Sequence, residues 1–425
     1  MIDMNTLNLT SEEESLLAGV EGPGVKRAME IVVALARIYG AADLIPVKHV
    51  QIAGVSYKNL GDAGVEFLSR WAAEGARMRV PATLNPMGME RGKWQSWGIQ
   101  PSFATPQLSV IDAFEAMGVT PTMSCTPYLF PGFKPQRGDA LAWAESSAVA
   151  FANSVIGARS NREGGPSAVA AGIVGRTARY GYHLDENRRA NWVVEVRAPL
   201  KSVADFGALS YSVGKAVGSD VPWFADLAES LPPLPGDMTL GGPAGDRLKT
   251  LGAGLAAYGA VAVYHIADYT PEARDAGVEL IRPGAKRLVI DSLEDAYRVM
   301  DADPDLRKID LVTIGCPHAS LSEIQQVAEA LEGKHLQTRL WVTTGQITRE
   351  RAAELGYVQI IEAAGGEVVA DTCAVVAPMR MLNVRTMATN AGKMACYAPM
   401  HSGVKMRFGD VEQCLDAAVT GEWRN

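Results

Sequence analysis

Five cysteines are the residues of this sequence best suited to metal or nucleophilic chemistry. Cys125, Cys316 and Cys373 each follow a short apolar segment that predicts a β-strand, whereas Cys414 lies in a predicted helix over 411–419. The number of cysteines is odd and no CxxC pair occurs, so the sequence predicts no disulfide framework. In open α/β sheets, ligands bind beyond the carboxyl ends of the strands, which is where these three thiols are expected.

Three thiolates from separate loops suit more than one kind of site. They can bind three irons of a four-iron cluster and leave the fourth iron open as a Lewis acid. Three ligands also suit a catalytic zinc ion. Ordinary buried cysteines are the remaining interpretation, because free cysteine is among the most buried residue types. Spacing alone favours this last interpretation.

Polar residues at other predicted strand ends form a second set of candidates. Gly54, Val55 and Ser56 follow a strand predicted over 49–53, and Asn85 and Pro86 follow one predicted over 77–84. The backbone amides and hydroxyl of such turns suit an anionic group, but the spacing is not that of a nucleotide-binding loop.

Charged residues in apolar or glycine-rich segments complete the candidates. Glu145 and Ser146 lie on an otherwise apolar helix, where a carboxylate is either paired or functional. Lys393 lies in a predicted loop of small residues that suits a phosphate or carboxylate partner. Arg159 and Arg162 lie in a glycine-bounded loop, from which arginines can bind carboxylate or phosphate. Taken singly, each of these segments is more simply interpreted as a surface turn.

The elements that must position these residues follow one pattern along the chain. Short apolar strands alternate with amphipathic helices, which predicts an α/β fold with largely parallel sheets covered on both faces. Strands are predicted over 49–53, 77–84, 119–124, 192–196, 260–265, 287–290, 311–314, 339–343 and 367–369. Helices are predicted over 25–39, 64–73, 108–117, 321–331 and 411–419, with a capping box of Ser11 and Glu14 before them. We take residues 1–425 as one catalytic unit, with a possible lobe boundary in the Pro/Gly-rich run 231–245.

Charge and hydropathy exclude several classes of partner. A net charge of −8 without a Lys/Arg cluster disfavours nucleic-acid binding. The N-terminus has neither the basic nor the apolar region of a signal peptide, so a cytoplasmic location is expected. Residues 250–267 carry no Asp, Glu, Lys or Arg, but the stretch is short for a membrane span and contains glycines. We expect a buried helix, a glycine turn and a buried strand there.

Seven segments, taken together, resemble one protein family. In order they are GVSYKNLGDAG, ATLNPMGM, PTMSCTPY, AWAESSAVAFANSVIGARSNREGGPSA, IGCPHAS, ADTC and TNAGK. This set resembles the large subunit of the aconitase X family over nearly the whole chain, and NSVIGARSNREGGPSA is its most specific part. The resemblance implies aconitase-like α/β/α lobes that lack the small swivelling domain, which would be a separate small subunit in a heterodimer.

The resemblance also implies a site. Cys125, Cys316 and Cys373 would bind a [4Fe–4S] cluster, and a [2Fe–2S] cluster is the alternative because the CxxC pair of aconitase itself is missing. Substrate would be bound by Gly54, Val55, Ser56, Asn85, Pro86, Glu145, Ser146 and Lys393. The family's serine base lies on the small part, so no catalytic residue is assigned in this chain.

Two hydro-lyase activities are known for the family. A stand-alone large chain is more similar to the enzyme of the archaeal mevalonate (isoprenoid) pathway, which dehydrates (R)-5-phosphomevalonate to trans-anhydromevalonate 5-phosphate. The alternative is cis-3-hydroxy-L-proline dehydratase, the same chemistry on a zwitterionic substrate. A non-catalytic iron-sensing, RNA-binding protein is a third alternative, against which the acidic charge argues.

Overall fold

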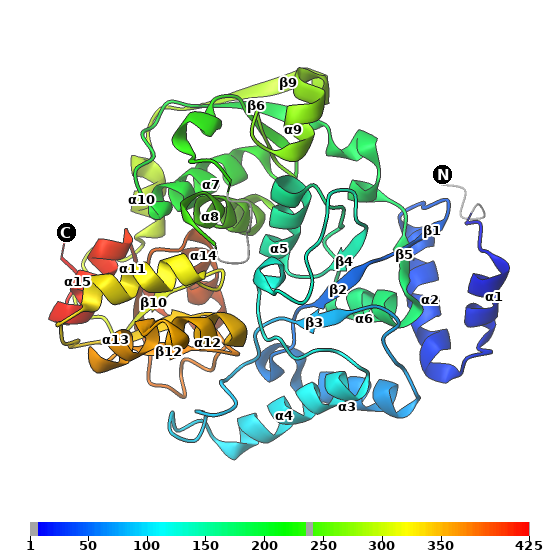
Figure 1. The fold of residues 1–425 in the computed structure, drawn as a ribbon, viewed down its shortest axis with the longest axis horizontal. Helices are drawn as coiled ribbons and strands as arrows, with labels where there is room; N and C mark the ends of the chain where they lie inside the picture. The colour runs from blue at the N-terminus through cyan, green and yellow to red at the C-terminus, as the bar shows by residue number, and fades with distance from the viewer. Residues whose placement is uncertain (1–6, 235–240, 425) are drawn as a thin grey trace.

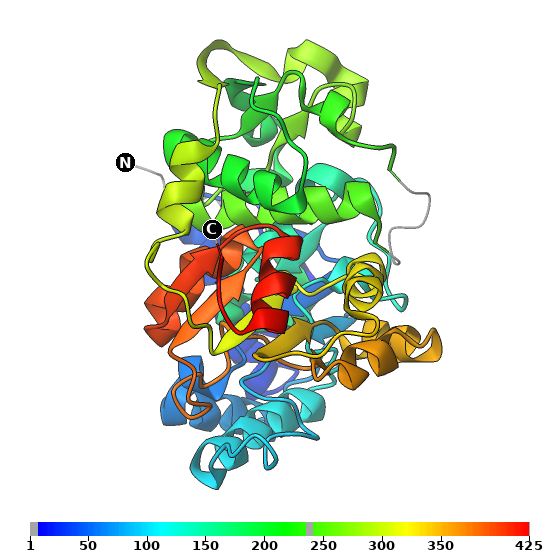
Figure 2. The same ribbon diagram turned by 90° about the vertical axis from the view of Figure 1, so that its left-hand side faces the viewer.

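The computed structural model describes residues 7–234 and 241–424, which form three lobes, each built on a parallel sheet. Figure 1 shows the first lobe in blue and cyan, the second in green and the third in yellow to red. Figure 2, turned by 90°, shows the second lobe lying over the other two. The prediction of an α/β fold with largely parallel sheets is therefore confirmed.

The first lobe contains a three-stranded sheet in the order β3-β2-β4. Its strands are β2 (His49–Ile52), β3 (Ala82–Leu84) and β4 (Leu141–Trp143). Its helices are α1 (Ser11–Ala18), α2 (Pro23–Ile38), α3 (Tyr57–Ala73), α4 (Pro101–Ala116), α5 (Ser146–Phe151) and α6 (Gly165–Val174). A separate antiparallel pair joins β1 (Leu44–Pro46) to β5 (Arg176–Ala178). All four residues of β2 are buried, as expected for the central strand of a covered parallel sheet.

The second lobe contains a four-stranded sheet in the order β8-β7-β6-β9. Its strands are β6 (Ala190–Val196), β7 (Pro222–Phe224), β8 (His265–Ile266) and β9 (Ile281–Ile290). Its helices are α7 (Val203–Val217), α8 (Pro243–Gly259), α9 (Pro271–Ala276) and α10 (Glu294–Met300). Helix α8 packs on α7, on α5 of the first lobe and on a helix of the third lobe, so it joins all three lobes.

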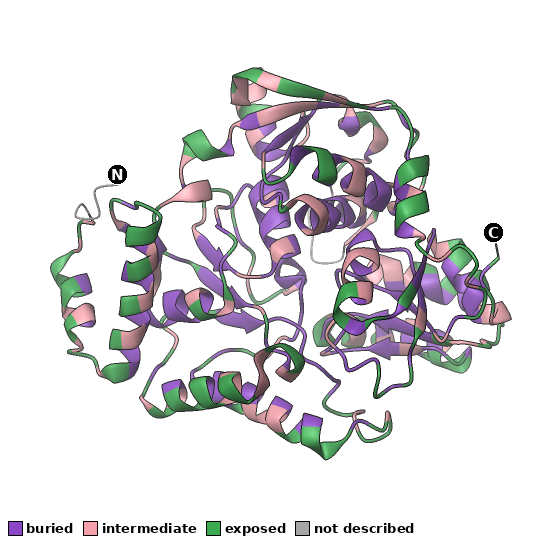
Figure 3. Cartoon of the chain, turned by 180° about the vertical axis from the view of Figure 1, so that it is seen from behind, coloured by how far each residue is buried: buried purple, intermediate pink, exposed green. Residues whose placement is uncertain are grey.

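The third lobe contains a five-stranded parallel sheet in the order β12-β11-β10-β13-β14. Its strands are β10 (Leu311–Ile314), β11 (Arg339–Thr343), β12 (Glu367–Val369), β13 (Thr386–Thr389) and β14 (Lys405–Phe408). Its helices are α11 (Leu321–Leu331), α12 (Gln346–Glu354), α13 (Tyr357–Ala363), α14 (Gly392–Ser402) and α15 (Val411–Thr420). Figure 3 shows buried residues gathered on the strands and where the lobes meet, whereas the outer faces of α1, α3 and α4 are exposed.

The uncharged stretch 250–267 forms the end of α8 and the segment that leads into β8. A methyl group added at Gly254 would lie 1.7 Å from the Ser210 hydroxyl of α7, so glycine is required for the close approach of these helices. The buried helix predicted here is confirmed, but only His265 of the predicted strand 260–265 belongs to a sheet. Among the described residues, no helix has the length and apolar character needed to cross a membrane.

Three other local predictions were wrong in detail. The capping box of α1 uses Thr10 and Glu13 rather than Ser11 and Glu14. The strand predicted over 119–124 is reduced to a single bridge at Thr120, because Pro121 cannot donate a hydrogen bond and Met123 has a positive φ of 45°. The strand predicted over 77–84 begins only at β3. The boundary predicted near 231–245 includes residues 235–240, which lie outside the described residues, and it stays a prediction.

Candidate active site

A cavity of about 300 Å³ lies where the first and third lobes meet. The predicted site residues that line it are Gly54, Val55, Asn85, Pro86, Cys125, Glu145 and Ser146 from the first lobe, and Cys316, Cys373 and Lys393 from the third. Ser56 is the one predicted residue that does not line the cavity; it is fully buried and donates its hydroxyl to Val376 O (3.2 Å). The structure therefore brings the two sets of candidates into one place.

The three cysteines reach the cavity from three separate loops. Cys316 follows β10 after Gly315, where glycine is required because φ is +99° and an added Cβ would lie 2.2 Å from Thr343 O. Cys373 lies four residues after β12. Cys125 follows no regular strand, but the Ser124 N–H donates to the carbonyl at the end of β3 (2.9 Å) and fixes the loop at the carboxyl edge of the first lobe's sheet.

The thiols are buried, and none of the five cysteines forms a disulfide. Cys125, Cys316 and Cys373 are 7%, 9% and 8% exposed. Burial raises the pKa of each thiol, that of Cys125 to about 12, while the nearby Lys393 ammonium acts in the opposite direction. Cys414 is fully buried on α15, away from this cavity. Bound metal would supply the positive charge that keeps such thiols ionised.

The donor set fits an iron–sulfur cluster better than a single ion. Over residues 7–234 and 241–424, no three His, Cys, Asp or Glu side chains lie close enough together to bind one metal ion. In a cluster, by contrast, each thiolate binds a different iron. Three buried thiols on one cavity supply that set of donors. The Cys125 sulfur also accepts a backbone N–H bond (3.2 Å), a contact that stabilises cluster thiolates.

A buried ion pair lies beside the thiols. Lys393 lies in the first turn of α14 rather than in the predicted loop. Its Nζ atom donates to Glu145 Oε1 and to the Ser147 hydroxyl (3.1 Å). Burial raises the pKa of the Glu145 carboxyl, but the Lys393 ammonium and hydrogen bonds from Lys393, Asn85 and Ser147 outweigh it and lower the pKa to about 2. Burial likewise opposes the charged form of Lys393, but Glu145 and the neighbouring thiols raise its pKa. Both groups are therefore charged at neutral pH.

A chain of amides connects this ion pair to the strand ends. Asn85 Nδ2 donates to Glu145 Oε2 (2.8 Å), and Gln51 Nε2 donates to Asn85 Oδ1 (3.1 Å). Gln51 Oε1 also accepts the Glu145 backbone N–H (3.0 Å). The sequence analysis missed Gln51 and Ser147. A polar residue in the middle of the fully buried strand β2 was the signal that could have revealed Gln51.

The arginine-containing loop contributes one residue to the cavity. Arg162 lines it and donates Nη1 to Ala260 O (3.0 Å), and in the described part of the chain it forms no ion pair. Arg159 lies outside the cavity, where it pairs with Asp185 and donates to His183 O (2.9 Å). The loop follows a short π-helical turn (Ala152–Ile156), an irregularity that is frequent at functional sites.

Comparison with known proteins identifies the class to which this fold and site belong. The family models for the first, second and third domains of aconitase X match residues 6–186, 190–298 and 309–420. The chain belongs to the aconitase X family. It is also similar to the crystal structure of aconitase X from Thermococcus kodakaraensis in its holo-form, with a TM-score of 0.86 and 42% identity over 97% of this chain and 100% of that chain.

Curated relatives give a finer comparison. The phosphomevalonate dehydratase large subunit of Methanocaldococcus jannaschii is 44% identical over 96% of this chain and 99% of its own length. The protein of the same name from Methanosarcina mazei is 43% identical over 98% of both chains. The cis-3-hydroxy-L-proline dehydratase of Pseudomonas aeruginosa is 34% identical, and the match covers 97% of this chain but 70% of that protein.

Proposed function

We propose that this chain is the large subunit of a hydro-lyase that dehydrates (R)-5-phosphomevalonate to trans-anhydromevalonate 5-phosphate in an isoprenoid-forming mevalonate pathway. The observation that carries the proposal is the cavity where three buried thiols lie beside the Glu145–Lys393 pair. The near full-length similarity to subunits named phosphomevalonate dehydratase supports the choice of substrate. The word "subunit" in those names supports a heterodimer with a small subunit.

Positive charge on the cavity suits the two anionic ends of this substrate. Arg162 has a guanidinium without an ionic partner among the described residues, so it can bind a phosphate through two N–H groups. The amides of the Gly54–Val55 turn and the Asn85 side chain provide further polar contacts for a carboxylate. We therefore place the substrate across this cavity, with its phosphate at Arg162.

Cys125, Cys316 and Cys373 are proposed to bind an iron–sulfur cluster, for which [4Fe–4S] is the first choice. When bound, such a cluster with one open iron supplies a Lewis acid for the departing hydroxyl group. The ammonium of Lys393 lies near Cys316 and Cys125, so it offsets part of the negative charge that their thiolates would carry. Glu145 in turn fixes the position of that ammonium.

Dehydration also requires a base that removes a proton from the carbon next to the carboxylate, while the hydroxyl leaves from the neighbouring carbon. Neither charged group of the buried pair suits this task. Glu145, with a pKa lowered to about 2, is a weak base, and Lys393 is protonated. We propose that the base is supplied by the small subunit.

Turnover of the assembled enzyme tests the function. The chain is produced anaerobically with its candidate small subunit, and 5-phosphomevalonate is followed by phosphorus NMR. We expect an anhydro-phosphomevalonate product that disappears in Cys316→Ala. An intact iron–sulfur spectrum without turnover would refute this substrate. cis-3-Hydroxy-L-proline is then tested in the same assay, because the Pseudomonas aeruginosa relative is 34% identical across this chain.

The assignment of the phosphate to Arg162 has a matched control in the same loop. Arg162→Gln is expected to raise KM for phosphomevalonate by about 10- to 100-fold, which corresponds to the loss of one charge-assisted contact of about 1.5–3 kcal/mol. Arg159→Gln removes a cation that lies outside the cavity and should leave KM unchanged. An equal effect of both variants would exclude a specific role for Arg162.

A further inference from the structure

His318 connects the three loops that contain the cysteines of the cavity. It lies two residues after Cys316, and its backbone N–H donates to the Cys125 sulfur (3.2 Å). Its ring Nδ1 lies 3.3 Å from the Ser124 hydroxyl, and its ring Nε2 lies 3.2 Å from Thr372 O. Ser124 precedes Cys125, and Thr372 precedes Cys373. The residue is fully buried and does not line the cavity, so its contacts are to the loops rather than to a ligand.

The partners of the imidazole ring fix its tautomer. The carbonyl oxygen of Thr372 can only accept a hydrogen bond, so Nε2 carries the proton. Nδ1 is then the acceptor, and the Ser124 hydroxyl donates to it. Each ring nitrogen therefore has one defined role, and the ring connects a loop of the first lobe with one of the third.

A buried cluster of charged side chains fixes the backbone of His318. Lys249 of α8, 3% exposed, donates Nζ to His318 O (3.1 Å). The same ammonium pairs with Glu323 of α11 and lies 3.5 Å from Asp246 Oδ1. Glu323 also accepts the Ser320 N–H (3.0 Å), which begins α11. The loop that contains Cys316 is thereby tied to the second lobe.

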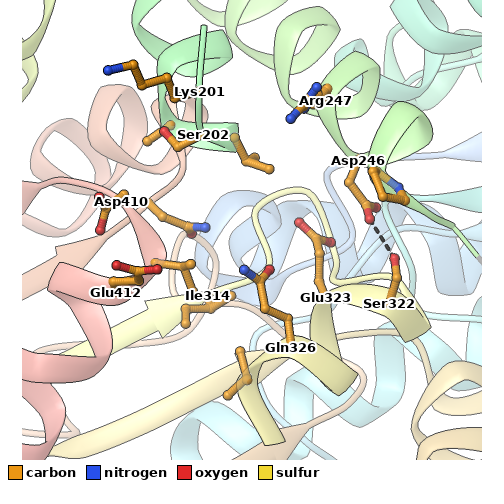
Figure 4. A pocket seen from close by; sticks show the side chains of 16 residues that line it. Lys201, Ser202, Asp246, Arg247, Ile314, Ser322, Glu323, Gln326, Asp410 and Glu412 are labelled. Atoms are coloured by element: carbon orange, nitrogen blue, oxygen red, sulfur yellow. Dashed lines mark hydrogen bonds between the residues drawn. The ribbon is translucent and has the colours of Figure 1, made fainter. Parts of the chain in front are cut away.

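This ion cluster lies beside a second, larger cavity of about 540 Å³, which contains no cysteine. Figure 4 shows Glu323, Asp246 and Ser322 together on one side of it, with the hydrogen bond from the Ser322 hydroxyl to Asp246 (2.6 Å) drawn as a dashed line. Asp246 and Glu323 line this cavity, whereas Lys249 does not. The Lys249 ammonium thus lies between this cavity and the His318 backbone. Its contacts are with the carboxylates and the backbone carbonyl rather than with the cavity.

We propose that His318 is a positioning residue that sets the mutual geometry of the three cysteine loops, and that Lys249 with Glu323 anchors it. His318 does not itself bind metal. The proposal depends on the proposed function in one respect: it takes the three cysteines as ligands of one cluster. Groups that orient metal ligands without touching the metal typically alter metal affinity about 10- to 100-fold when they are removed. A network that only contributed to folding stability would have no selective effect on the cysteines.

The positioning is tested first on the metal-free chain. Alkylation rates of Cys125, Cys316 and Cys373 are measured by peptide mass spectrometry in the wild type, His318→Ala and His318→Gln. We expect His318→Ala to speed the alkylation of Cys125 and Cys373 about tenfold or more. Glutamine carries an N–H donor for Thr372 O and a carbonyl acceptor for the Ser124 hydroxyl, so it can replace both ring contacts. The rates at Cys125 and Cys373 should therefore return toward the wild-type values in His318→Gln.

A matched control separates positioning from stability. Arg188, 1% exposed, pairs with Glu272 in the second lobe and contacts none of the cysteine loops. Arg188→Leu therefore disrupts a comparable buried cation and should leave all three alkylation rates unchanged. If His318→Ala does not fold, the double variant Lys249→Met with Glu323→Gln removes the anchor, while Asp246 keeps its hydrogen bonds from the Ser322 hydroxyl and the Gly242 N–H. It is expected to speed alkylation in the same way.

The second readout is the release of iron from the anaerobically reconstituted chain to a chelator. We expect release about 10- to 100-fold faster in His318→Ala than in Arg188→Leu, with a changed electron paramagnetic resonance spectrum. Alkylation rates and iron release equal to those of Arg188→Leu would overturn the proposal. A wild type that binds no iron would refute the proposed cluster, whereas selective alkylation in His318→Ala would still support the positioning.

Discussion

The buried ion pair of the candidate site yields a quantitative prediction. Glu145→Gln leaves the Lys393 ammonium, whose side chain is 9% exposed, with neutral acceptors in place of its carboxylate partner. The pKa of Glu145 is lowered from 4.5 to about 2, which corresponds to about 3 kcal/mol of folding free energy at pH 7. A loss of about 3 kcal/mol is also the usual result of removing one partner of a buried pair.

The pH dependence has a definite sign. Because the pKa of Glu145 is lower in the folded chain, its stabilisation is complete above pH 4.5 and is lost as the pH falls toward 2. The difference in unfolding free energy between wild type and Glu145→Gln should therefore be largest at neutral pH. It should shrink below pH 4.5 and nearly vanish near pH 2.

The assay is urea unfolding of the metal-free chain at pH 7 and at about pH 3, followed by tryptophan fluorescence. Glu354→Gln is the control, because its pair with Arg351 is 63% and 54% exposed and should change stability by less than about 0.5 kcal/mol. Adding Lys393→Met to Glu145→Gln should recover part of the loss, since no unpaired charge remains. A Glu145→Gln chain as stable as the wild type at pH 7, or a difference independent of pH, would refute this account.

Four further variants test other parts of the structure. Cys316→Ala should lose bound iron in anaerobic reconstitution, whereas Cys414→Ala should bind as much as the wild type, as iron analysis will show. Gly315→Ala forces a φ of +99° on alanine and places its methyl group 2.2 Å from Thr343 O, so we expect a loss of about 3 kcal/mol or more in urea unfolding. Gly254→Ala places a methyl group 1.7 Å from a hydroxyl of α7 and should lower the melting temperature, measured by calorimetry, without altering the KM of the assembled enzyme.

Strands of the third lobe show how far local sequence determines structure. The apolar runs of β10, β11 and β12 and the helix α11 begin and end at the predicted residues. Gly315 ends β10, Gly366 precedes β12 and Ser320 caps α11, so the local signals and the parallel sheet agree. The segment 119–124 differs, because Pro121 lies inside the apolar run and outweighs the strand propensity of its neighbours.

The site residues were predictable because of where they lie in the chain. Cysteines at the ends of apolar runs lie at the carboxyl edges of two sheets, that of the first lobe and that of the third, and the cavity lies where these lobes meet. Even the irregular loop of Cys125 reaches the edge of its sheet. His318 and Lys249 could not be predicted in this way. Their roles depend on contacts between residues 54 or more positions apart, which no local pattern encodes.

The placement of the thiols in two different lobes has a consequence for synthesis in the cell. At about 5–20 residues per second, Cys373 leaves the ribosome roughly 10 to 50 s after Cys125. During that interval the earlier thiol has neither its neighbours nor Lys393 beside it. The Cys125 thiol is therefore most accessible to an oxidant while the chain is still growing. Metal can bind to all three sulfurs only after the third lobe has been translated, so loading is expected to be a late step of maturation.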